Sequence, residues 1–121
     1  MATNWQAVDD LRHRWVKAYY QGDSDFLECV EAPFFFAKCG GRLTSKQQQL
    51  DALRAGMNHG LALAEIDDVI EARDHGSDWL TVKGEASVTL QGDAVGRYRY
   101  FEMWILMAGE WRITSLCFEQ I

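Results

Sequence analysis

The chain has 121 residues, enough for one domain around a single core and too few for two. Eighteen acidic residues against twelve basic ones give a net charge of −6, and the basic residues are scattered, which disfavours nucleic acid as a partner. Hydrophobic residues make up 48% of the chain, a proportion typical of globular proteins. We therefore expect residues 1–121 to form a single domain.

Apolar runs in the chain are too short to span a membrane, and no glycine-rich phosphate loop is present. The three cysteines, Cys29, Cys39 and Cys117, form neither a CxxC pair nor a Cys/His cluster, and their odd number fits a reducing compartment. We therefore expect a soluble, cytoplasmic protein without membrane association, metal or cofactor. Each cysteine is expected to be a small buried side chain.

Residues 4–21 have the periodicity of an amphipathic helix. Its apolar positions recur every three or four residues, and they are Trp5, Val8, Leu11, Trp15 and Tyr19. Gly22 follows directly, where a glycine commonly ends a helix. We expect this helix to pack its apolar stripe against the rest of the domain.

Shorter elements follow. Residues 25–30 predict a second helix, which Pro33 prevents from continuing. The apolar run at 32–37 predicts a buried strand with a short return strand after it. Thr44 or Ser45 is placed to cap a third helix that ends near residue 57.

From residue 61 the apolar period changes to two, which predicts long antiparallel strands up to the C-terminus. On the first of them, Asp68 is the one charged member of a face that it shares with Ile66 and Ile70. Two interpretations stay open for this residue. If the face points inward, Asp68 is a candidate general acid or base; if the strand is an edge, Asp68 is a solvated surface carboxylate.

Turns fix the register of the last three strands. A turn at Gly92-Asp93 places Lys83 opposite Glu102 as a cross-strand ion pair, and a second turn is expected at Gly109-Glu110. With this register the face that the helices cover carries Phe101, Met103, Phe118 and Arg99. The opposite face carries Tyr98, Tyr100, Trp104 and Trp111. Aromatic side chains of this kind are typical of a protein interface, so we expect a homodimer through this outer face.

Helices followed by long antiparallel strands make an α+β layout. The segments WVKAYYQGDSDFL (15–27), GGRLTSKQQQLDAL (40–53) and GEWRI (109–113) resemble the nuclear-transport-factor-2-like superfamily, which includes ketosteroid isomerase, scytalone dehydratase and SnoaL-like cyclases. The resemblance implies a cystatin-like cone, in which a curved antiparallel sheet wraps around N-terminal helices and encloses an apolar pocket. It also implies that homodimers form through the outer face of the sheet.

The catalytic residues of ketosteroid isomerases have no counterparts at the matching positions. Trp15 stands nearest to the position of their oxyanion-binding tyrosine, with Tyr19 one turn later. The segment at 34–37, where the resemblance would place the catalytic base, has no carboxylate, and the position of the second acid falls near Met103. The resemblance therefore does not carry that isomerase mechanism to this chain.

Two functions are consistent with these residues. The first is a homodimeric domain that binds a small hydrophobic or aromatic molecule in a pocket lined by Trp15, Tyr19, Phe101, Met103 and Phe118. The alternative is a SnoaL-like lyase, isomerase or hydrolase that uses Asp68, Arg99 or Tyr19 for acid/base chemistry. An inward carboxylate within hydrogen-bond reach of a tyrosine or arginine would favour the enzyme.

Overall fold

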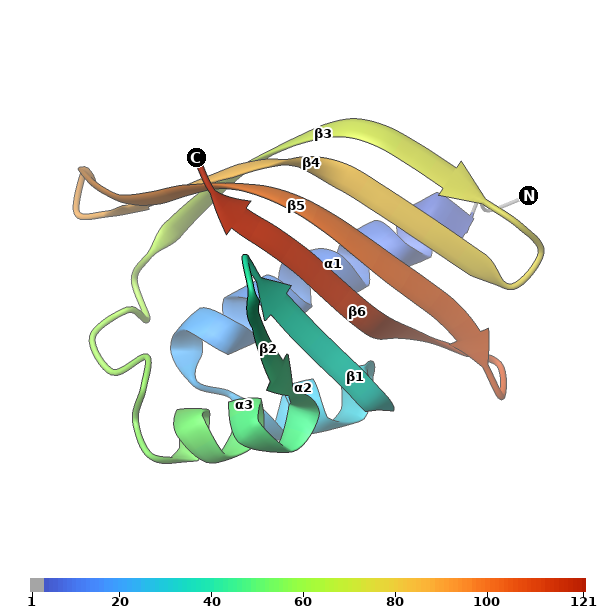
Figure 1. Cartoon of the computed structure of the whole chain (residues 1–121), viewed down its shortest axis with the longest axis horizontal. Helices are drawn as coiled ribbons and strands as arrows, with labels where there is room; N and C mark the ends of the chain where they lie inside the picture. Colours follow the sequence, from blue (N-terminus) through green and yellow to red (C-terminus); the bar gives the residue numbers. More distant parts are fainter. Residues whose placement is uncertain (1–3) are drawn as a thin grey trace.

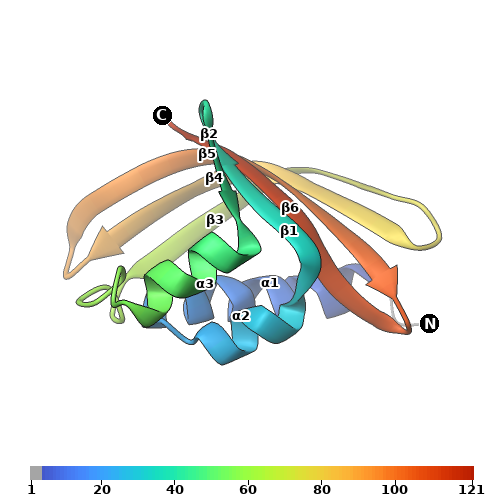
Figure 2. The same ribbon diagram turned by 60° about the horizontal axis from the view of Figure 1, so that its bottom comes forward.

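The computed structural model describes residues 4–121, in which helices lie under one curved six-stranded sheet (Figures 1 and 2). The elements are α1 (Asn4–Gln21), α2 (Ser24–Val30), β1 (Glu31–Cys39), β2 (Arg42–Ser45), α3 (Lys46–Arg54), β3 (Glu65–His75), β4 (Trp79–Leu90), β5 (Asp93–Met107) and β6 (Glu110–Gln120). The strand order is β2-β1-β6-β5-β4-β3. Only the β1–β6 pair is parallel.

Local signals end and begin the helices as expected. At Gly22, with a φ of +74°, the backbone N–H of the following Asp23 donates to Ala18 O at 2.8 Å, which satisfies a carbonyl at the end of α1. Ser45 and Gln48 form a reciprocal capping box at the start of α3. This helix ends at Arg54, earlier than expected, because the chain turns at Gly56, whose φ is +90°.

The sheet curves around α1, which runs under its concave face, while α2 and α3 cover the part of that face near β1 (Figure 2). Between helix and sheet, Trp15 packs edge-on against Trp104 with ring centroids 6.3 Å apart. Phe35 and Ile113 are also fully buried in this core. The predicted α+β fold with a curved sheet around N-terminal helices is therefore confirmed.

The register between β4 and β5 differs from the expected one. The tight turn is Gln91-Gly92, with φ values of 53° and 85°, so Leu90 lies opposite Asp93. Two positive φ angles give the turn whose twist matches paired strands, and that preference outweighs the Gly-Asp signal one residue later. A β-bulge then shifts the pairing again after Thr89, and Lys83 lies opposite Phe101. The predicted pairing of Lys83 with Glu102 is wrong.

The same slip occurs at the next hairpin, where Ala108 and Gly109 have φ values of 51° and 81°. Met107 therefore pairs with Glu110, and a β-bulge between Met103 and Trp104 then shifts the pairing so that Tyr100 lies opposite Phe118. A shift of one residue moves every side chain of a strand to the other face. The bulge between Val88 and Thr89 makes this one-residue shift, so the β5 side chains are inverted relative to the expectation.

This inversion corrects both predicted faces. Phe101 is 42% exposed on the convex side of the sheet, and Met103 lies on the same side. The four aromatic residues expected outside lie inside: Tyr100 and Trp104 are buried, Tyr98 lines a cavity, and Trp111 packs against the core. Phe118 keeps its inward position because the bulge between Met103 and Trp104 pairs it with Tyr100, which also lines the cavity.

Two burial predictions from the first half of the chain are also wrong. In the strand expected to be buried, Phe34 is 60% exposed, and Phe36 is exposed as well. Cys29 and Cys39 are exposed, and Cys117 is half-buried. The phenylalanines alternate between the two faces of β1, so one strand face meets the helices while the other faces outward.

Candidate functional site

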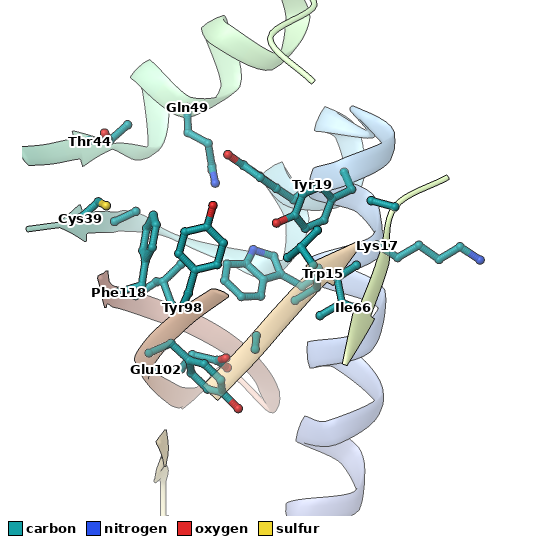
Figure 3. A pocket seen from close by; sticks show the side chains of 18 of the residues that line it. Trp15, Lys17, Tyr19, Cys39, Thr44, Gln49, Ile66, Tyr98, Glu102 and Phe118 are labelled. Atoms are coloured by element: carbon teal, nitrogen blue, oxygen red, sulfur yellow. The ribbon is translucent and has the colours of Figure 1, made fainter. Parts of the chain in front are cut away.

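A cavity of about 1020 Å³ lies between α1 and the concave face of the sheet. Figure 3 shows Trp15 and Tyr19 of α1 lining it together with Tyr98 and Phe118 of the sheet. Gln49 reaches in from α3. A concave site of this size, walled by aromatic side chains with few polar groups, is typical of sites for small organic molecules.

A buried arginine organises the polar wall of this cavity. Arg12 of α1 is 3% exposed, and its Nε donates to Glu102 Oε1 at 2.7 Å while its Nη2 donates to Glu102 Oε2 at 3.0 Å. This bidentate pair fixes the orientation of both side chains. Trp104 Nε1 donates a further hydrogen bond to Glu102 Oε1 at 3.0 Å.

The same guanidinium reaches Asp68 on β3. Arg12 Nη2 lies 3.0 Å from Asp68 Oδ2 and 2.9 Å from the Tyr100 hydroxyl oxygen, and that hydroxyl donates to Asp68 Oδ1. Asp68 is 18% exposed and lines the cavity. Asp68 therefore points inward, as the first of the two interpretations expected. Its basic partner is Arg12 rather than Arg99.

Gly84 of β4 makes room for this contact. Tyr100 is the cross-strand partner of Gly84, and a Cβ atom at that glycine would lie 2.7 Å from the Tyr100 hydroxyl oxygen. It would also lie 2.4 Å from the carbonyl oxygen of Val69. Only a glycine lets the Tyr100 side chain cross β4 toward Asp68 on β3.

Burial and charge set the protonation states of this cluster. Burial disfavours the charged guanidinium, but the hydrogen bonds and charge of Glu102, with those of Tyr100 and Asp68, outweigh burial and raise the pKa of Arg12. Burial also raises the pKa of Tyr100, and its hydrogen bond to Asp68 raises that pKa further. At neutral pH Arg12 is a cation and Tyr100 a neutral donor.

A second buried carboxyl group lies behind the cavity wall. Glu31 has no exposed surface, and its Oε2 accepts a hydrogen bond from Trp15 Nε1 at 2.9 Å. Within residues 4–121, no geometric hydrogen bond reaches its other oxygen. Burial raises the pKa of Glu31 to about 7, against the opposing effects of Trp15, Gln49 and Lys46. The side chain is therefore partly protonated near neutral pH.

The tyrosines add neutral polar groups to the cavity. Tyr19, Tyr20 and Tyr98 all line it. Burial raises the pKa of Tyr20 to about 12, and it raises the pKa of Tyr19 as well. The phenols of Tyr19 and Tyr20 therefore stay protonated over the physiological range and offer hydroxyl groups without adding charge.

The structure brings some of the predicted site residues together and separates others. Of the predicted binding residues, Trp15, Tyr19 and Phe118 line the cavity, whereas Phe101 and Met103 lie on the convex face. Of the catalytic candidates, Asp68 and Tyr19 line the cavity, whereas Arg99 is exposed and lies 3.5 Å from Glu119. The register shift of β5 is the reason for each misplacement.

Sequence reasoning missed Arg12, although its position carried a signal. Arg12 lies four residues after Val8 and three before Trp15, so it interrupts the apolar stripe of α1 with a charge. A charged side chain on the buried face of a helix needs a partner of opposite charge. Glu102 was assigned to a surface pair because the predicted register turned it outward.

Neither a metal site nor a membrane span is indicated within residues 4–121. No group of three or more His, Cys, Asp or Glu side chains is placed to hold a metal ion in this part of the chain. In the same residues, no helix is long and apolar enough to cross a membrane.

The fold and cavity define an α+β domain with a curved sheet closed over helices. No family model and no curated protein matches the sequence. Solved structures do match the fold.

An NTF2-like protein from Cytophaga hutchinsonii superposes with a TM-score of 0.79 at 15% identity, covering 99% of this chain and 100% of that one. A protein of unknown function with a cystatin-like fold from Nostoc punctiforme has a TM-score of 0.83 at 12% identity, covering 100% and 93% of the two chains. A ketosteroid isomerase-like protein from Erwinia carotovora atroseptica has a TM-score of 0.69 at 14% identity, covering 93% and 92%.

These likenesses show the fold alone, because all three identities are low. The chain has the NTF2-like, cystatin-like cone fold, and the resemblance noted in the sequence is confirmed at that level.

Proposed function

We propose that the cavity between α1 and the sheet binds a small, largely apolar or aromatic molecule. The observation that carries this proposal is the cavity of about 1020 Å³, whose walls are mainly aromatic and aliphatic while its polar groups converge from several elements. Trp15, Tyr98 and Phe118 supply flat surfaces for an aromatic body. The hydroxyl groups of the tyrosines orient the bound molecule through hydrogen bonds.

A cavity-filling variant with a matched control tests this proposal. Ala86 and Ser87 are neighbours on β4, and only Ala86 lines the cavity. Binding of the neutral dye Nile red would be followed by the increase and blue shift of its emission. We expect Ala86→Leu to weaken binding at least about tenfold, because its larger side chain occupies the cavity, and Ser87→Leu to leave it unchanged. Equal binding of Nile red by the two folded variants would show that this cavity is not the binding site.

Acid/base catalysis is the second candidate function, and the contact between Asp68 and Tyr100 favours it. Asp68 is an inward carboxylate at the cavity wall, held by a tyrosine and an arginine. A carboxylate so oriented can accept a proton from a bound substrate and return it elsewhere, as an isomerase or lyase requires. We propose Asp68 as the group that would carry the proton.

Deuterium exchange tests this second function without knowledge of the natural substrate. The ketone 2-indanone would be incubated with the protein in D₂O, and exchange at its α-carbons would be read by mass spectrometry. We expect Asp68→Asn to lose any protein-dependent exchange, while Glu85→Gln, the same change on the outer face of β4, keeps it. Exchange at the buffer rate with wild-type protein would argue for binding without catalysis.

A further inference from the structure

The charges of the cluster around Arg12 do not balance. Among the residues that the structure describes, two carboxylates, Asp68 and Glu102, share this guanidinium, and the other hydrogen-bond donors to them, Tyr100 and Trp104, are neutral. Asp9 also approaches Arg12, at 3.9 Å, but its closer partner is another arginine, Arg73. The cluster therefore holds one negative charge in excess. Glu102 is 3% exposed and Asp68 18% exposed, and an excess charge on partly buried groups is stabilised by a cation beside it.

Other basic groups around the cavity do not supply that cation. The three remaining basic residues that line it, His13, Lys17 and Arg42, are all exposed. Figure 3 shows the Lys17 side chain pointing away from the cavity. Charges exposed to solvent are screened by water and salt, so they compensate a buried charge poorly.

Aromatic rings surround the space beside this negative cluster. Six aromatic side chains line the cavity: Trp15, Tyr19, Tyr20, Tyr98, Tyr100 and Phe118. Asp68 and Tyr98 are separated on the sheet only by the small side chain of Ala86, their common cross-strand partner. The faces of aromatic rings attract cations, and a carboxylate beside them strengthens this attraction.

We propose that the ligand of this cavity is an organic cation, an amine or quaternary ammonium group on an aromatic or aliphatic body. Its cationic group lies against Asp68 and the neighbouring rings, where it neutralises the excess charge. Its apolar body occupies the rest of the cavity. This inference rests on the proposed binding function and adds the charge of the ligand to it.

Three molecules with the same indole body and different charge test the inference. Tryptamine is a cation at pH 7, indole-3-ethanol is neutral, and indole-3-acetate is an anion. Binding to the wild-type protein would be measured by calorimetry at pH 7. We expect tryptamine to bind about tenfold or more tightly than indole-3-ethanol, with indole-3-acetate weakest, because only the cation offsets the charge of the cluster.

Asp68→Asn removes the excess charge and keeps an oxygen that can accept hydrogen bonds. The affinity of this variant for tryptamine is expected to fall to its affinity for indole-3-ethanol. Glu85→Gln is the matched control, because it makes the same change on the outer face, where Glu85 pairs with Arg97 at 2.8 Å. The wild-type comparison alone decides the inference if Asp68→Asn does not fold.

The outcomes separate this inference from the function on which it rests. Equal or tighter binding of indole-3-ethanol by the wild-type protein would overturn the cation preference. Failure of tryptamine to bind, while Nile red still binds, would overturn it too. Loss of Nile red binding as well would remove the binding function itself.

Discussion

Glu31 shows how one buried carboxyl group couples folding to pH. Its side chain is fully buried, and Trp15 Nε1 donates a hydrogen bond to its Oε2 at 2.9 Å. The raised pKa of about 7 means that the folded protein prefers the neutral form. The contribution of neutral Glu31 to the free energy of unfolding is fully present at pH values below the unfolded pKa of about 4.5. This contribution is lost as the pH rises through 7.

Replacing Glu31 by Gln should remove this dependence. We expect the free energy of unfolding of wild-type protein to fall, relative to Glu31→Gln, by up to about 3 kcal/mol between pH 4.5 and pH 8, because each pKa unit corresponds to about 1.4 kcal/mol. Urea denaturation of both proteins across this range measures the difference. A difference that stays constant with pH would show that Glu31 is ionised throughout.

Glu102 and Lys83 provide a second test at the residue scale, because the structure separates them. Lys83 is exposed, whereas Glu102 is buried and holds Arg12. Glu102→Ala should destabilise by about 3–5 kcal/mol, since it leaves the Arg12 charge buried without its main partner. Lys83→Ala should change stability by less than about 0.5 kcal/mol. Chemical denaturation checks both, and a coupling energy between the two changes would contradict the observed register.

Strand β4 is the element that connects the site to the sheet. On its inward face two small residues, Gly84 and Ala86, lie between Val82 and Val88, opposite Tyr100 and Tyr98. The small residues leave room for the tyrosine rings and for the cavity. The spacing on this one strand therefore determines how far side chains of β5 can reach toward β3.

Gly84→Ala should disturb this arrangement. Its Cβ would lie within 3 Å of both the Tyr100 hydroxyl oxygen and a backbone carbonyl, so we expect a loss of about 1–3 kcal/mol in stability from overpacking. Gly41→Ala is the control, because no atom lies within 4 Å of its added Cβ and its φ is not positive. Thermal denaturation compares the two; equal midpoints would mean that Tyr100 does not need this space.

At the scale of the whole molecule, the convex face of the sheet carries apolar side chains between charged ones. Phe36 and Phe101 are exposed there, and Met103 and Ile105 line a shallow hollow with Trp79. Charges of both signs flank them, with Glu85 between Arg97 and Arg99. We propose that a second copy of the chain covers this face, since apolar centres with mixed charges at the rim suit a symmetric contact.

Sedimentation at micromolar concentration tests this association. We expect wild-type protein to sediment as a dimer and Phe101→Lys to sediment as a monomer, because the change places a charge in the centre of the contact. Lys83→Ala, at the cross-strand partner of Phe101, is a milder comparison on the same face. A monomeric wild-type protein at these concentrations would reject the proposal.

Periodicity along the chain was enough to predict the helices, the strands and an α+β layout, and the resemblance to the NTF2-like superfamily implied the cone. The limits of α1 and β4 follow from the apolar stripe at 4–21 and the alternation at 79–90, and both lie where expected. Three of the predicted cavity residues, Trp15, Tyr19 and Phe118, also face inward. These signals are local, because each depends only on neighbouring residues in one element.

The faces of β5 and the cluster around Arg12 were decided only by the tertiary structure. Both faces of β5 are largely apolar, so its alternation fits either orientation, and the choice depends on the β-bulge between Val88 and Thr89, which shifts the pairing by one residue. Arg12 and Glu102 are 90 residues apart and meet only when β5 turns its even-numbered side chains toward α1. The sequence therefore determined the elements and their general arrangement, whereas long-range packing determined which polar side chains meet in the cavity.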